Sequence, residues 1–111
     1  MQIARRKLTF RGTQRTVTVS MTAPRKLRGK PAFVVLIGIN GIGLRVIHRV
    51  LGVDEFQAID LAMRVIGREL ESKRYSGLRW RYGMNQRDLG FPRSDDQKLP
   101  GCIGQRDRGG C

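Results

Sequence analysis

The side chains that most often carry out chemistry in proteins are scarce in this chain. It has one histidine, His48, and two cysteines, Cys102 and Cys111, among 111 residues. Nucleophilic catalysis needs a base that activates a hydroxyl or thiol, and general acid–base catalysis needs a positioned titratable group. His48 falls on the apolar side of an alternating segment, which favours a core histidine over a catalyst. The sequence therefore predicts that the chain is not an enzyme.

The carboxylates do not form an acid–base pair or a metal site. Asp54 has the position of a helix cap, and Asp60 and Glu69 have basic residues four positions later, as in ordinary ion pairs on a helix surface. Structural zinc sites need about four Cys or His ligands at close spacings, and no further ligand lies near the two cysteines. These cysteines fit either a reduced pair or a disulfide in a C-terminal tail. We expect no metal and no cofactor.

One glycine-rich segment, Gly-Ile-Asn-Gly-Ile-Gly at positions 38–43, resembles a phosphate-binding loop. Phosphate loops lead into the N-terminus of a helix, where backbone N–H groups meet the phosphate. Here a strand pattern follows instead, and no Gly-Lys-Ser/Thr is present. Asn-Gly is the preferred pair of a type I′ turn, because both positions need a positive φ. The segment therefore predicts a hairpin turn at Asn40-Gly41.

Basic residues are the remaining candidates for function. The chain has 22 Lys and Arg against 9 Asp and Glu, a net charge of +13. The imbalance is concentrated in residues 1–53, which contain eleven basic residues and no acidic residue. Such a half-chain projects a positive field that attracts polyanions. The same composition also results when a GC-rich genome favours arginine codons and the charges are simply solvated.

The sequence positions these basic residues in two settings. Some alternate with apolar residues in strands and so point away from the core, and others lie in the loop at residues 23–31. The predicted site for nucleic acid or another anion consists of Arg25, Lys26, Arg28, Lys30, Arg45, Arg49, Arg79 and Arg81. Arginine commonly contacts phosphate. Phe10, Trp80 and Tyr82 fall on the opposite, apolar face, so we expect backbone-directed binding without base stacking.

The elements that must position this site follow from hydrophobic periodicity. Residues 2–10, 16–21, 32–39, 44–51 and 78–82 have the pattern of strands. A helix begins after Asp54 and ends before Gly77, with an apolar stripe of Phe56, Ile59, Met63, Ile66 and Leu70. The small residues beside this stripe, Ala58, Ala62 and Gly67, should let the helix lie close to the sheet. The order β-β-β-β-α-β predicts an α+β fold of two layers. A mostly antiparallel sheet of four to five strands forms one layer, and the long helix covers one of its faces.

The chain organisation is that of one small domain. We expect residues 1–92 to form it and the polar residues 93–111 to be a disordered tail. No apolar run approaches the roughly 20 residues that span a bilayer. The charged N-terminus has no apolar signal region behind it. We therefore expect no membrane association and a cytoplasmic location.

Three segments resemble a family of small uncharacterised bacterial proteins. They are Gly-Val-Asp-Glu-Phe-Gln-Ala-Ile-Asp-Leu-Ala at 52–62, Ile-Gly at 66–67 and Leu-Gly-Phe-Pro at 89–92. The resemblance covers residues 3–92. It implies a bacterial cytosolic domain and carries over no catalytic residue.

Two functions are compatible with these observations. The first is non-catalytic binding of an anionic partner, foremost the backbone of nucleic acid, through the basic site. The second is a protein-interaction module that forms a homodimer or captures an acidic protein. An apolar strand such as residues 33–39 usually needs cover on both faces, which favours the second reading.

Overall fold

The computed structural model describes residues 1–85 and 88–92, so the predicted tail and both cysteines lie outside the described residues. The elements are β1 (Gln2–Phe10), β2 (Thr16–Thr22), β3 (Arg25–Lys26), β4 (Phe33–Gly41), β5 (Leu44–Gly52), α1 (Glu55–Leu70), the 3-10 helix η1 (Lys73–Tyr75) and β6 (Leu78–Arg79). The predicted α+β order is confirmed. The short β3 is an addition within the segment predicted as a loop.

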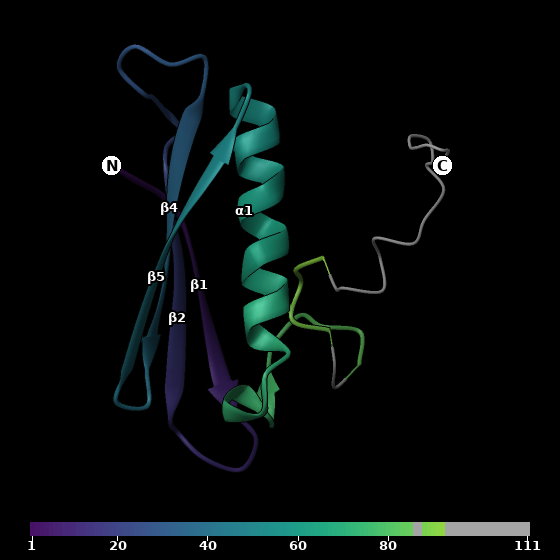
Figure 1. Ribbon diagram of the computed structural model, residues 1–111. Coiled ribbons are helices and arrows are strands. Elements are labelled where there is room, and N and C mark those ends of the chain that lie inside the picture. The colour runs from purple at the N-terminus through teal and green to yellow at the C-terminus, as the bar shows by residue number, and fades with distance from the viewer. Residues whose placement is uncertain (86–87, 93–111) are drawn as a thin grey trace.

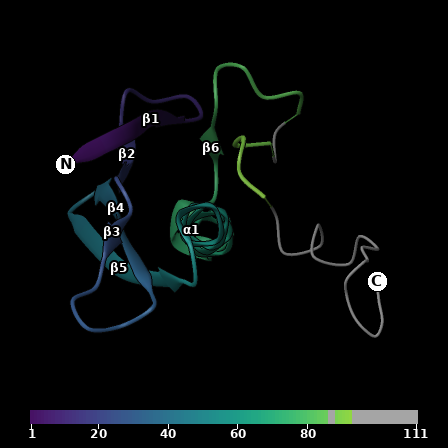
Figure 2. The same ribbon diagram turned by 90° about the horizontal axis from the view of Figure 1, so that it is seen from above.

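All strand pairs are antiparallel, and the sheet runs β5-β4-β2-β1-β6, with β3 beside β4 beyond the end of β2. Helix α1 lies along one face of this sheet (Figure 1). Seen along the helix axis, the strands curve around one side of α1 (Figure 2). The molecule therefore has the two predicted layers, with the helix on one face of the sheet.

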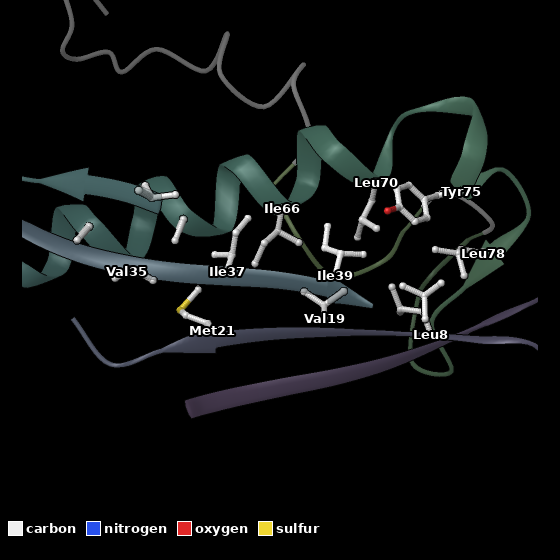
Figure 3. Packing of buried hydrophobic residues seen from close by; sticks show 14 residues of the cluster. Leu8, Val19, Met21, Val35, Ile37, Ile39, Ile66, Leu70, Tyr75 and Leu78 are labelled. Carbon is white, nitrogen blue, oxygen red and sulfur yellow. The ribbon is translucent and has the colours of Figure 1, made fainter. Parts of the chain in front are cut away.

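The core lies between the helix and the inner face of the sheet. Alternate residues of the central strands point toward α1, and they include Val19, Ile37 and Ile39, all at most 2% exposed (Figure 3). Ile66 meets them from the helix. Val34 is also buried but lies outside this cluster, because alternation along β4 points it to the face opposite to that of Ile37 and Ile39. The core thus fixes which residues of every strand point outward.

The start of α1 follows the predicted cap. Asp54 accepts a hydrogen bond from the Gln57 backbone N–H at 2.7 Å, and the Gln57 side chain accepts one from the Val53 N–H at 2.7 Å. These bonds pair backbone donors that the first helical turn cannot satisfy itself. The helix direction is therefore set immediately after β5.

The predicted apolar stripe of α1 is partly wrong. Phe56 is 87% exposed, whereas Ala58 and Ala62 are fully buried together with Ile66 and Leu70. The helix presents its small residues to the sheet because the chain turns sharply after β5 and brings the helix backbone close to the strand. The predicted close approach at Ala58 and Ala62 is therefore confirmed, and the error concerns Phe56, at the start of the stripe.

The predicted turn at Asn40-Gly41 is also wrong. Both residues lie within β4, and the turn is formed by Ile42 and Gly43, with φ of 51° and 75°. A Cβ on Gly41 would lie 3.0 Å from Val17 Cα and even closer to the Thr16 carbonyl oxygen. Gly41 is therefore needed where β4 packs closely against β2. The two turn positions with positive φ are Ile42 and Gly43, so β-branched Ile42 adopts a conformation that such residues rarely take.

Candidate nucleic-acid interface

The face of the sheet that α1 does not cover is polar in its middle and basic at its sides. We call it the uncovered face; it carries Arg5, Lys7, Thr9, Thr16, Thr18, Ser20, Leu36, Gly38, Asn40, Arg45, Ile47, Arg49 and Leu51. Strand register aligns four of these side by side. This polar row is Lys7, Thr18, Asn40 and Arg45, one residue from each of β1, β2, β4 and β5. Paired positions share a face, so their side chains point the same way.

Among residues 1–85 and 88–92, no carboxylate lies on the uncovered face. Residues 1–53, which supply β1 to β5, contain no Asp or Glu. The acidic side chains of the described chain come from α1, its flanks and Asp88, all beyond residue 53. The segregation of charge along the sequence thus becomes a segregation between the two layers. A face of one sign in a small domain generates a directed field.

The structure divides the predicted site residues between two edges of the sheet. Arg45 and Arg49 lie on β5 at one edge, and Arg79 and Arg81 lie at or just beyond β6 at the other. Four strand spacings separate these edges, about 19 Å. The structure therefore brings these four arginines together only as pairs, with the polar row between them.

The basic loop residues lie at one end of the sheet, beside the edge of β4 that is opposite to β5. Arg25 and Lys26 form β3 and pair with Val34 and Phe33 of β4. Arg28 and Lys30 lie in the turn closed by the Leu27 N–H bond to the Ala32 carbonyl at 2.9 Å, and both are exposed. The predicted flexible loop is in fact anchored at one end of the sheet.

At the β1–β6 edge, the exposed basic side chains are not all the predicted ones. Arg79 is half-buried, and its guanidinium donates to the Leu78 carbonyl at 3.0 Å. Arg5 and Lys7 are exposed on the adjacent strand and were missing from the predicted site. Their alternation with Arg6 and Leu8 in the sequence is the signal that identifies them.

The prediction that Tyr82 lies on the buried face is wrong. Strand β6 ends at Arg79, so the alternation that would have carried Tyr82 inward does not continue. Tyr82 is 70% exposed, and the Arg81 guanidinium carbon lies 5.5 Å from its ring centroid. Trp80 is half-buried and meets Tyr82 at 5.9 Å with an interplanar angle of 77°. An exposed aromatic ring therefore stands beside the basic residues.

Arg6 holds the last described segment against the sheet. It lies on the inner face of β1, where its guanidinium carbon is 3.9 Å from the Trp80 ring centroid and 4.6 Å from that of Phe91. It also donates to the Leu89 carbonyl at 3.0 Å. Burial lowers the pKa of Arg6 from its ordinary value, and the Asp88 carboxylate opposes this effect. We call these contacts the Arg6 clamp (Arg6, Trp80, Leu89 and Phe91).

Asp88 forms hydrogen bonds with the backbone on both sides of it, next to the Arg6 clamp. Its carboxylate accepts hydrogen bonds from the Met84 N–H at 3.0 Å and from the Gly90 N–H at 2.9 Å. These two bonds, the Met84 bond first, lower the pKa of the Asp88 carboxyl below its ordinary 3.8, and Arg6 adds to the shift. The bonds therefore favour the ionised form in the folded chain.

The stability of the fold should depend on pH through this carboxyl. Because its pKa is lower in the folded than in the unfolded chain, ionised Asp88 stabilises the fold above about pH 4 and this contribution is lost as the pH falls through the folded pKa. We expect the free energy of unfolding to decrease from about pH 5 to pH 2 less steeply in Asp88→Asn than in the parent chain. Urea unfolding at a series of pH values measures both slopes. Equal slopes would contradict this role.

Two further ion pairs involve residues of α1. His48 lies on the inner side of β5 as predicted, but the prediction of a core histidine is wrong, because its side chain is 41% exposed. Its Nε2 lies 3.3 Å from Glu69 Oε2 on α1, so Glu69 contacts His48, whereas Lys73 was the predicted partner. Arg64 pairs with Asp60 as predicted, at 3.2 Å. Within residues 1–85 and 88–92 no three His, Cys, Asp or Glu side chains are grouped to hold a metal.

Tyr75 is a buried tyrosine at the end of α1 and lines a hollow of about 560 Å³ with Ser72. Neither hydroxyl makes a hydrogen bond of ordinary geometry within the described residues. Burial raises the pKa of Tyr75 above its ordinary value of 10.0, and the nearby Arg74 charge opposes this shift. The hydroxyl therefore remains protonated at neutral pH and is no base.

Comparison with known families places the chain. The model of a domain of unknown function, DUF6968, matches residues 4–93. The chain belongs to the DUF6968 family. No curated protein and no solved structure matches it. In the described part of this DUF6968 domain, no helix has both the length and the apolar character needed to cross a bilayer.

The segments at 52–62 and 89–92 of this DUF6968 domain have structural roles. Gly52 is buried, and a Cβ on it would lie 2.7 Å from Ala58 Cα. Gly67 faces the other segment, because a Cβ there would meet the Pro92 carbonyl oxygen. The sequence placed Gly67 against the sheet, whereas the structure places it against residues 91–92. Both glycines therefore allow the helix backbone to approach another part of the chain.

Proposed function

We propose that this DUF6968 domain is a non-catalytic domain that binds the phosphate backbone of nucleic acid through the uncovered face. The polar row on a face without carboxylates is the observation that carries the proposal. Cations attract phosphate oxygens, and hydroxyl and amide groups donate hydrogen bonds to them. Contacts of this kind do not read base edges, so binding should depend weakly on sequence and strongly on salt. Such a partner implies a cytoplasmic location.

The arrangement of charge supports an extended ligand. Cations stand at both sides of the sheet, and the strands between them carry uncharged Thr18, Ser20 and Asn40. Arg45 and Arg49 are exposed, and the acidic residues of α1 lie on the other layer. A long polyanion can contact both sides at once, whereas a small anion would contact only one.

Neutralising the β5 edge should reduce the salt dependence of binding. In Arg45→Gln/Arg49→Gln, loss of two phosphate contacts lowers the slope of log affinity against log salt by about 1.8 for a duplex. We expect the affinity near physiological salt to fall about tenfold. Each exposed charge contact contributes up to about 1 kcal/mol, two such contacts are lost, and a tenfold change corresponds to about 1.4 kcal/mol. Fluorescence anisotropy with a labelled 20-base-pair duplex across a salt series measures both quantities.

A matched variant controls for net charge. Arg64→Gln/Arg68→Gln removes the same two charges from α1, on the other layer, with a residue that forms helices well. We expect this control to bind with nearly the parent slope. If both double variants lose the same affinity and the same slope, binding follows net charge alone and the proposed face is wrong.

A protein partner is the second candidate, and one observation favours it. The uncovered face ends in the exposed apolar residues Leu36, Ile47 and Leu51, which are 37%, 58% and 49% exposed. Ile47 and Leu51 lie on β5, and Leu36 lies on the neighbouring β4. The outer edge of β5 pairs with no described strand. Light scattering distinguishes the two functions: a stable dimer that fails to bind the duplex supports the interaction module, and a monomer that binds it supports the nucleic-acid proposal.

A further inference from the structure

An open pocket of about 760 Å³ lies where the chain leaves the sheet after β6. Its walls come from β1, from the turn between β1 and β2, and from the residues that follow β6. The lining residues that matter here are Arg5, Lys7, Thr9, Trp80, Arg81 and Tyr82. We call this hollow the edge pocket.

The edge pocket is built for a negatively charged group. Arg5 and Lys7 are two residues apart on β1, so both point to the uncovered face, and Arg81 also lines the pocket. None of the described residues that line the pocket is Asp or Glu. Lys7 also begins the polar row, so the pocket continues the surface of the proposed function. A phosphate bound in the pocket would therefore lie next to the polar row, which is proposed to bind further phosphates of the same nucleic-acid strand.

The edge pocket also offers an aromatic surface. Tyr82 is 70% exposed, and its position is supported by Trp80 at 5.9 Å, which the Arg6 clamp holds in place at 3.9 Å. Exposed aromatic rings in a positively charged groove bind unpaired bases by stacking, with little preference for sequence. A base in a duplex has both faces covered by its neighbours and cannot use such a ring.

We infer that the edge pocket binds one nucleotide of a single-stranded nucleic acid, with its base stacked on Tyr82 and its phosphates at Arg5, Lys7 and Arg81. The inference rests on the proposed function and narrows it from any nucleic-acid backbone to strands with unpaired bases.

Tyr82→Ala tests the inference with a labelled 12-residue oligodeoxythymidine as the single strand and the 20-base-pair duplex as the comparison. We expect about a tenfold loss of affinity for the single strand, the usual effect of one stacked base, and no change for the duplex. Tyr82→Phe keeps the ring and should bind the single strand like the parent chain. Far-ultraviolet circular dichroism and the melting temperature confirm that each variant is folded.

Phe56→Ala is the matched control, because it removes another exposed ring, 87% exposed, from the far end of the molecule at the start of α1 (Figure 1). It should leave single-strand affinity unchanged. Unchanged affinity in Tyr82→Ala, or an equal loss in Phe56→Ala, would overturn the inference. Thymidine monophosphate that binds as tightly as the oligomer would overturn the assignment of a strand as the ligand.

The two proposals fail separately. If Tyr82→Ala has no effect while Arg45→Gln/Arg49→Gln lowers the salt slope, the edge pocket is wrong and the uncovered face stands. If Tyr82→Ala weakens single-strand binding while the arginine pair has no effect, the edge pocket stands and the uncovered face is wrong.

Discussion

Gly52→Ala is expected to lower the free energy of unfolding by about 3 kcal/mol, at the upper end of the usual cost of overpacking. The added Cβ would meet the backbone of Ala58, with Ala58 Cα at 2.7 Å and the Ala58 nitrogen closer still. A flexible side chain could move aside, but a helix backbone held by the Asp54 cap cannot do so without displacing α1. Urea unfolding followed by circular dichroism measures the change.

The neighbouring residue provides the control for Gly52. Val53 is 69% exposed, so Val53→Ala removes little buried surface and should change the free energy of unfolding by less than about 0.5 kcal/mol. A similar small change in Gly52→Ala would show that the helix does not depend on this contact. The close approach of strand and helix would then need another cause.

Arg6→Ala is expected to lower the free energy of unfolding by about 2–3 kcal/mol. The variant loses contacts of the guanidinium with two aromatic rings, each worth about 1 kcal/mol when partly desolvated, and leaves the Leu89 carbonyl without its donor. Arg6→Lys keeps the charge but not the planar group that lies between Trp80 and Phe91, so its stability should be intermediate. Because the chain has one tryptophan, the emission of Trp80 reports on the same site during unfolding.

Arg15→Ala is the matched control for the Arg6 clamp. Arg15 is exposed and its guanidinium carbon lies 5.7 Å from the Phe10 ring centroid, a looser version of the same contact. We expect it to change stability by less than about 0.5 kcal/mol. Equal effects of Arg6→Ala and Arg15→Ala would mean that residues 89–92 are not held by the clamp.

The sequence by itself predicted the α+β fold class, the order of its main elements and the helix cap at Asp54. These follow from local rules, because side-chain alternation and capping bonds involve residues that are close along the chain. It also predicted that the basic first half would form strands. The absence of acids from the uncovered face is therefore a property that the sequence already contains.

The sequence could place residues on a face but could not place them relative to one another across the sheet. Alternation put Arg45, Arg49, Arg79 and Arg81 on one side, and strand order then separated them into pairs at opposite edges. Strand order depends on contacts distant in sequence, such as the pairing of β2 with β4, and no local pattern reports them.

The exact positions at which backbones approach closely were decided by the tertiary structure. It moved the hairpin turn from Asn40-Gly41 to Ile42-Gly43, and it turned the helix so that Ala58 is buried and Phe56 is exposed. The tertiary structure also decided that Tyr82 is exposed, because the pairing of β6 with β1 stops after Arg79. Local propensity describes what each residue favours alone, whereas packing selects the one arrangement that the whole chain can adopt.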